Sequence, residues 1–163
     1  MTVQNLDVAC ATLGVKLGSS GNKDTENSIT KALGVLEEQG IYAMFLYLVA
    51  REDSKFVPDL IAFMEEWCGL KGGKLRYESW TKAKKKLDEV KKSAKSHKDR
   101  KGVRQAVETA RKDEKASREA FFQTLCDYAN DLDNLLFARD LLHRTLVYAR
   151  YHAKAAQIGG DGT

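Results

Sequence analysis

The stretch SITKALGVLEEQGIYAMFLYLVARE, residues 28–52, decides the fold class of this 163-residue chain. Its apolar residues recur at spacings of three and four, which is the pattern of one buried face of a helix. From Ile41 to Ala50 nearly every residue is apolar, and because this run is too short to span a membrane it predicts a central core helix. Gly40 marks either a close approach of another helix or a kink or break. The stripe consists of Ile29, Leu33, Leu36, Gly40, Ala43 and Tyr47.

The remaining segments also have helical patterns. Residues 5–17 predict a first helix and residues 18–27 a flexible connection, after which Asn27 or Ser28 would cap the next helix. Pro58, the single proline, and Asp59 are expected in the first turn of a further helix. Residues 91–102 (KKSAKSHKDRKG) predict a flexible loop, and a break near 128–134 (YANDLDN) separates two C-terminal helices. We therefore expect an all-α fold, a compact helical bundle of about five to six helices, with one domain over residues 1–157 and a disordered tail at 158–163.

Basic residues are concentrated in one part of the chain. The formal net charge is +4, but residues 82–118 hold 15 Lys or Arg against 6 Asp or Glu. The rest of the chain holds 12 basic and 17 acidic residues. This asymmetry indicates a polyanionic partner or, alternatively, a solvated lysine-rich face that only keeps the protein soluble.

Cysteines and histidines follow no metal-binding pattern. The three cysteines form no CxxC pair, and the three histidines do not combine with them at a ligand spacing, so we expect core cysteines in a reducing compartment and no metal. The sequence has neither a Walker A motif nor a dinucleotide-binding glycine motif, so no cofactor and no small-molecule substrate are expected. With no apolar run long enough for a membrane and no signal-peptide pattern, a cytoplasmic protein is expected.

The segment LLHRTLVYARYHAKAAQ, residues 141–157, predicts a helix with two different faces. At about 100° per residue, its leucines and small alanines form one buried stripe that allows tight packing. A second sector holds a row of cations that can run along phosphates, although cations near a helix C-terminus are also favoured by the helix dipole. The predicted row consists of Arg139, His143, Arg150 and Lys154, with Arg144 and Tyr151 to one side.

These residues do not match a catalytic motif. In HEPN ribonucleases, which are small helical proteins, four to six residues separate the catalytic Arg from the His. Here Arg139 and His143 enclose three residues, and Arg144 and His152 enclose seven. We therefore expect no catalytic residue, and a HEPN-like ribonuclease with an irregular Arg/His pair remains an alternative function.

Two stretches together resemble a known family. VLEEQGIYAMFLYLVARE, residues 35–52, resembles the early core helix of the small subunit of type III CRISPR effector complexes, in which a pair ending in glycine precedes an apolar run. LLFARDLLHRTLVYARYHAKA, residues 135–155, resembles the final helix of that family, where leucine and aromatic positions alternate with basic ones. The resemblance implies a helical bundle without cofactor or catalytic residue, whose copies stack head to tail beside the subunits that carry the guide RNA.

The resemblance also implies RNA contacts. Basic side chains of the family's filament touch the guide–target duplex or the target strand, and the lysines between residues 82 and 92 are a second candidate for this role. We expect a non-catalytic subunit of a CRISPR interference complex, with guide and target RNA, other effector subunits and stacked copies of itself as partners. A helical adaptor that holds a partner helix in an apolar groove is the other alternative. The predicted RNA-contacting residues are Arg139, His143, Arg144, Arg150, Lys154, Lys84, Lys85 and Lys92.

Overall fold

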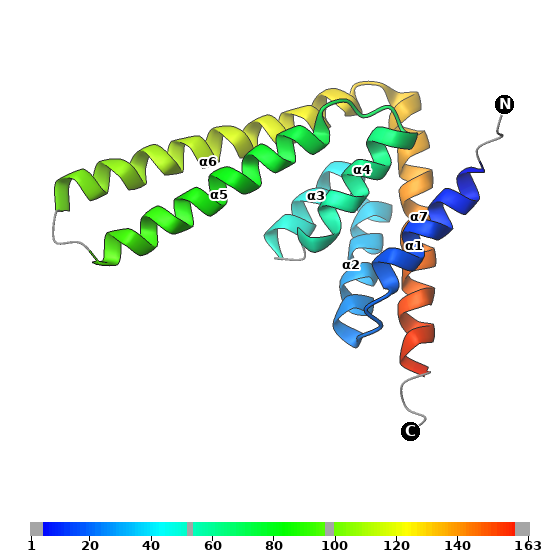
Figure 1. The fold of residues 1–163 in the computed structure, drawn as a ribbon. Helices are drawn as coiled ribbons and strands as arrows, with labels where there is room; N and C mark the ends of the chain where they lie inside the picture. The colour runs from blue at the N-terminus through cyan, green and yellow to red at the C-terminus, as the bar shows by residue number, and fades with distance from the viewer. Residues whose placement is uncertain (1–4, 52–53, 97–99, 159–163) are drawn as a thin grey trace. The chain divides into compact units, whose positions relative to one another are not determined.

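The computed structural model describes residues 5–51, 54–96 and 100–158, which contain helices and no strand. The all-α prediction is confirmed, with seven α-helices in this part of the chain in place of the five to six expected. None of these helices is both long and apolar enough to cross a membrane. The elements are α1 (Leu6–Gly18), α2 (Lys23–Gln39), α3 (Ile41–Ala50), the 3-10 turn η1 (Ser54–Phe56), α4 (Val57–Trp67), α5 (Gly73–Ser96), α6 (Arg100–Ala129) and α7 (Leu132–Ile158) (Figure 1).

The helices group into two compact units. Unit 1 combines the chain up to Leu70 with the chain from Tyr128 onward, and so contains α1–α4 and α7. Unit 2 covers Lys71–Asp127 and consists of α5 and most of α6. The single domain predicted for residues 1–157 stays a prediction, and each of the two units has buried apolar residues of its own.

Helix α7 is the central helix of unit 1, because it packs along both α1 and α2 (Figure 1). Its predicted apolar stripe is buried, from Leu142 to Ala153. The tight packing expected at its alanines is with α1: a Cβ atom added to Gly18 would lie 2.5 Å from the carbonyl oxygen of Ala149. Glycine at this position therefore lets the two backbones touch.

The stretch that decides the fold class forms two helices. Gly40 has φ +91°, in the region that favours glycine, and its N–H donates to Leu36 O at the end of α2. Of the alternatives for Gly40, the structure has the break. The cap predicted at residues 27 or 28 is wrong, because α2 begins earlier: the side chain of Asn22 accepts from the Thr25 N–H at 2.7 Å. Acidic residues follow in that first turn, where the helix dipole favours them.

Three other predicted boundaries can be compared with the structure. Pro58 lies in the first turn of α4, and α6 and α7 are separated at residues 130–131, both as predicted. The loop predicted at 91–102 is largely helical, since residues 91–96 complete α5 and residues 100–102 begin α6; residues 97–99 lie outside the described chain. Lysine and alanine are good helix formers, and the absence of large apolar residues from this stretch does not distinguish an exposed helix from a loop. Ile158 ends α7, while the rest of the predicted tail, 159–163, also lies outside the described residues.

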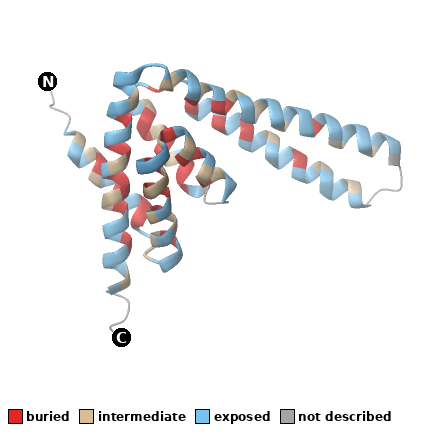
Figure 2. Ribbon diagram, turned by 180° about the vertical axis from the view of Figure 1, so that it is seen from behind, coloured by how far each residue is buried: buried red, intermediate tan, exposed pale blue. Residues whose placement is uncertain are grey.

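Unit 2 is a hairpin of two antiparallel helices, α5 and α6 (Figure 1). Its core is densest where Trp80 stacks on Phe121, with ring centroids 5.8 Å apart, and where Tyr77 and Phe122 add tilted and edge-on contacts. Buried residues become sparser toward the C-terminal end of α5 (Figure 2), where the facing residues are small. The hairpin therefore has a strong aromatic end and a thin remainder.

Candidate nucleic-acid interface

Three of the five cations predicted on α7 are engaged inside unit 1. Arg139 donates from Nη2 to Glu37 O at 2.6 Å and from Nε to Leu36 O at 3.4 Å, which satisfies carbonyl groups at the C-terminal end of α2. His143 Nε2 lies 2.8 Å from the Glu37 carboxylate, and Arg144 pairs with Asp140 on the same helix at 3.1 Å. Arg139 and His143, one of the two Arg/His pairs considered for a ribonuclease, thus hold α7 against α2.

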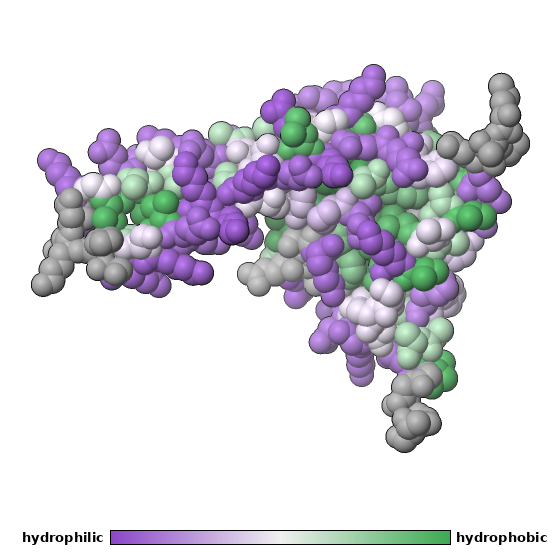
Figure 3. Space-filling model, viewed as in Figure 1, coloured by the Kyte–Doolittle hydropathy of each residue, from purple (hydrophilic) through white to green (hydrophobic). Residues whose placement is uncertain are grey.

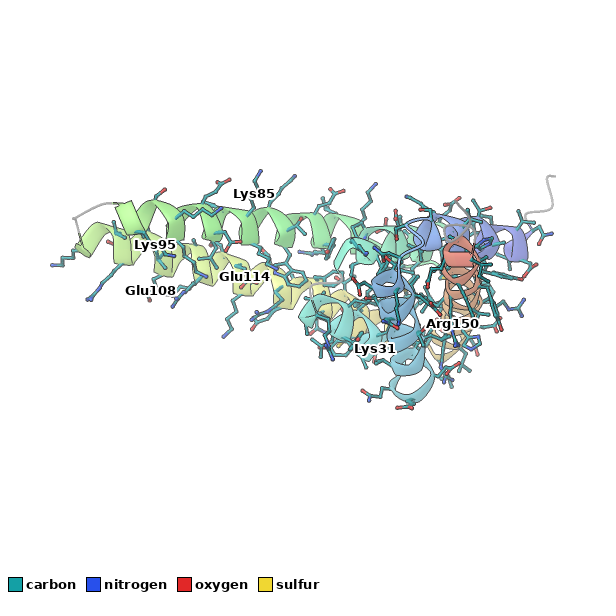
Figure 4. The ribbon with its side chains drawn as sticks, turned by 90° about the horizontal axis from the view of Figure 1, so that it is seen from below. Lys31, Lys85, Lys95, Glu108, Glu114 and Arg150 are labelled. Atoms are coloured by element: carbon teal, nitrogen blue, oxygen red, sulfur yellow. The ribbon has the colours of Figure 1, made fainter. Side chains whose placement is uncertain are left out.

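The other two predicted cations of α7, Arg150 and Lys154, are exposed and have no ion-pair partner within the described chain. Arg150 lies on the C-terminal half of the helix (Figure 4). Tyr151 beside it is 65% exposed. The free part of the predicted row is therefore two cations and one ring, rather than a continuous line of charge.

The predicted lysines of α5 are all free. Lys84, Lys85 and Lys92 are exposed, and none of them has an ion-pair partner among the residues that the structure describes. Lys85 points away from α6 (Figure 4). The visible face of the hairpin is mostly hydrophilic (Figure 3). Unit 2, and not α7, therefore carries most of the cations that are available to a partner.

Five cations of the hairpin repeat at intervals of seven residues and share one side of it. Seven residues are about two helical turns, so each series stays on one flank of its helix. Around the axis of each helix, followed in chain direction, the cations lie about 50–110° from the centre of the buried stripe, and the sense of this rotation is the same for α5 and α6. In an antiparallel pair of right-handed helices, rotation in the same sense places side chains on the same side. We call this side the basic flank; it consists of Lys84 and Lys91 of α5 and Arg104, Arg111 and Arg118 of α6.

Cations of the two helices lie at nearly the same levels along the basic flank. Trp80 donates from its indole Nε1 to Glu114 Oε1 at 2.7 Å and stacks on Phe121, so its level on α6 lies between these two residues. Lys84 is one turn beyond Trp80 along α5, which places it within about one turn of Arg111. Lys91 and Arg104 follow one seven-residue repeat further along α5 and α6, so cations lie near cations at both levels. Equivalent positions of paired helices usually carry opposite charges that attract each other.

The opposite flank of the hairpin carries one lysine and two carboxylates in place of a series of cations. Its positions on α5 are Ser79, Lys86 and Ser93, and its positions on α6 are Ala106, Asp113, Ala120 and Asp127. The basic flank therefore holds five of the 15 basic residues of 82–118, while other lysines, such as Lys85 and Lys86, lie outside it. Lys91, Arg104, Arg111 and Arg118 were not among the residues predicted individually, and their seven-residue spacing is the sequence signal that could have found them.

One carboxylate links the basic flank to the aromatic core. Glu114 has a side chain only 15% exposed, accepts from Trp80 and lies 3.7 Å from the Arg118 guanidinium. Two further ion pairs of the hairpin join Lys112 to Glu108 and Lys115 to Glu119 within α6, all with exposed side chains. Exposed pairs of this kind contribute little to stability, about 0.3–0.5 kcal/mol each. Arg118 is therefore the positioned member of the flank, and the four others are free of ion pairs in the described chain.

The thiols of unit 1 are placed for packing rather than chemistry. Cys10 is buried and donates to Leu141 O at 3.5 Å, and burial raises its pKa. Burial also raises the pKa of Cys68 to about 12. Both are therefore protonated near neutral pH, and a thiol is a poor nucleophile and metal ligand in that form. Cys126 is exposed, so the core position expected for the cysteines is wrong for this one. Within the described residues no cluster of three or more potential metal ligands occurs.

Comparison with known proteins found no match: no family model, curated protein or solved structure matches the chain.

Proposed function

We propose that this chain is a non-enzymatic, RNA-contacting subunit of a ribonucleoprotein complex. The observation that supports it best is the set of exposed cations in unit 2 that have no acidic partner in the described chain. Phosphates dominate the affinity of proteins for nucleic acids, and they require only cations at suitable positions. A surface of this kind suits contact that does not depend on base sequence.

The proposed assembly is a type III CRISPR interference complex, in which the chain would be the small subunit. The support is the resemblance of residues 35–52, of which 35–39 lie in α2 and 41–50 in α3, and of residues 135–155 in α7. Guide and target RNA, other effector subunits and stacked copies of this chain are the proposed partners. Protein neighbours could use the apolar groove between α1 and α4 or the exposed apolar side chains of unit 1. These side chains are Val8, Val15, Tyr42, Leu46, Leu132, Leu136, Phe137, Tyr151 and Ile158.

The proposal is tested by titrating the purified chain with a labelled, unstructured RNA while salt rises from low to physiological concentration. Intactness of the RNA is followed in the same samples. We expect binding that weakens steeply with salt, because counterions are released from the phosphates on binding, and RNA that stays whole. Absence of binding to this RNA and to an RNA duplex at every salt concentration would refute RNA contact, and progressive cleavage would return the ribonuclease alternative.

A further inference from the structure

We infer that the basic flank binds the phosphates of a double-stranded nucleic acid without reading its bases. This inference rests on the proposed function and adds the site and the class of ligand. The flank presents two lines of cations, Lys84 and Lys91 on α5 and Arg104, Arg111 and Arg118 on α6. Like charges at nearly the same level repel each other in the free protein, and a polyanion laid along both lines removes that cost.

The dimensions of the basic flank suit an extended and rigid ligand. At about 1.5 Å per residue, Arg104 and Arg118 lie about 21 Å apart along α6, and Lys84 and Lys91 about 10 Å apart along α5. Packed helix axes are about 8–10 Å apart, so the two lines can reach different strands of one duplex. A duplex carries one phosphate per about 3.4 Å of each strand, which gives several phosphates within reach of each line.

The rings of the hairpin argue against a single strand as the preferred ligand. Proteins that bind single strands combine cations with exposed aromatic rings on which bases stack, worth about 1–3 kcal/mol per base. All four Phe, Tyr and Trp residues of unit 2 are buried in its core: Tyr77, Trp80, Phe121 and Phe122. A flexible single strand would pay conformational entropy to follow the straight flank and gain no stacking in return.

The test compares two variants of the full chain, each with four substitutions, that lower the net charge equally. The flank variant is Lys84→Gln, Lys91→Gln, Arg104→Gln and Arg111→Gln, which leaves Arg118 and its contact with Glu114 in place. The comparison variant changes lysines of α5 outside the flank: Lys82→Gln, Lys85→Gln, Lys86→Gln and Lys92→Gln. Glutamine is a good helix former, so both variants should keep their helices, and circular dichroism is used to check this.

Binding is measured by fluorescence anisotropy at about 0.1 M salt. The probes are a short RNA duplex, a DNA duplex of the same sequence, duplexes of other sequences, the single RNA strand and a poly-glutamate peptide. At this salt one lost phosphate contact costs about eightfold in affinity, so losing two of four contacts weakens duplex binding about 60-fold. We expect at least that loss for the flank variant and a loss at least tenfold smaller for the comparison variant. Duplexes of all sequences should bind alike and more tightly than the single strand.

Several results would overturn the inference. Equal losses in the two variants would show that only net charge matters, and tighter binding of the single strand would exclude a duplex as the ligand. If the unaltered chain binds poly-glutamate but no nucleic acid, the flank meets an acidic protein and the proposed function fails as well. If the flank variant binds nucleic acid with the affinity of the original chain, the inferred site is wrong and the proposed function still stands. Preference between the RNA and DNA duplexes identifies which of them the flank accepts.

Discussion

Adding one methyl group at Gly18 should loosen the contact on which unit 1 depends most. A Cβ atom there would meet the carbonyl oxygen of Ala149 at 2.5 Å and the backbone nitrogen of Ala153 at 2.9 Å. These are backbone atoms of α7, so they can yield only if α1 and α7 move apart. Overpacking of this kind costs about 1–3 kcal/mol, and the upper end applies because no flexible side chain can absorb the clash.

The helix propensity of alanine offsets part of this cost. Replacing glycine by alanine inside a helix gains about 1 kcal/mol, and Gly18 is the last residue of α1, so the gain there is at most that value. Gly18→Ala should therefore lower the free energy of unfolding by about 2 kcal/mol or slightly more. For a unit of this size the melting temperature should fall by about 10 °C. Gly34→Ala is the matched control, because Gly34 lies inside α2 with nothing within 4 Å of the added Cβ atom. That variant should be more stable than the original chain, by up to about 1 kcal/mol.

The assay is urea-induced unfolding read from the fluorescence of Trp67. The chain has two tryptophans, one in each unit, so a Trp80→Phe background leaves Trp67 in α4 as the reporter of unit 1. Opposite signs for Gly18→Ala and Gly34→Ala are the expected result. If both substitutions stabilise the protein, then α1 and α7 are not in backbone contact and the close packing described for unit 1 is wrong.

Four further predictions follow from the contacts described. Arg139→Gln removes two hydrogen bonds to the end of α2 and should lower the free energy of unfolding by about 1–2 kcal/mol. Arg150 has no ion-pair partner in the described chain, so Arg150→Gln should change this free energy by less than about 0.5 kcal/mol. Urea denaturation measures both changes. A disulfide reagent should modify the exposed Cys126 rapidly, but Cys10 and Cys68 only on unfolding, and a second fast thiol in the native protein would contradict their burial. The folded-state pKa of Cys68 is about 12, above the ordinary thiol value of about 8.5. The buried neutral thiol therefore contributes its full stability below about pH 8.5, and this contribution is lost as pH rises toward about 12. The urea midpoint should accordingly fall less steeply at alkaline pH in Cys68→Ala than in the original chain. Amide hydrogen exchange should be faster at residues 84–96 and 100–110 than around the aromatic cluster of the hairpin. An RNA duplex should slow the exchange of residues 84–96 and 100–110. Uniform protection along the hairpin without RNA would contradict a thin core.

The helices were predictable because their signals are local. The stripe from Ile29 to Leu36, the proline at the start of α4 and the polar break before α7 each act within a few residues, and all three correspond to features of the structure. Gly40 could not be decided in this way. Whether a glycine packs against a neighbour or ends a helix depends on its φ angle, which the sequence does not determine, and the structure has φ +91°.

The roles of the cations on α7 depend on tertiary structure. Arg139 could be placed on a helix face from its spacing, but the carbonyl groups that it binds, at Leu36 and Glu37, are about 100 residues away in the chain. Nothing near Arg139 in the sequence indicates that the end of α2 lies beside it. The basic flank is the reverse case, because its seven-residue spacing is visible in the sequence. It was missed because residues 91–102 were interpreted as a loop, which interrupts α5 and removes the antiparallel register that brings the two series together.

The two units use positive charge in different ways, and this difference separates stability from binding. In unit 1, Arg139 is bonded to the end of α2, so its removal acts first on folding. In unit 2, Lys84, Lys91 and Arg104 have no ion-pair partner in the described chain and repel one another, so their removal should leave the hairpin as stable as before or more stable. Selection for stability alone would not keep cations at positions where they oppose each other. Their arrangement is therefore better explained by an external polyanion than by the fold, and added salt, which screens the repulsion, should stabilise the hairpin while it weakens nucleic-acid binding.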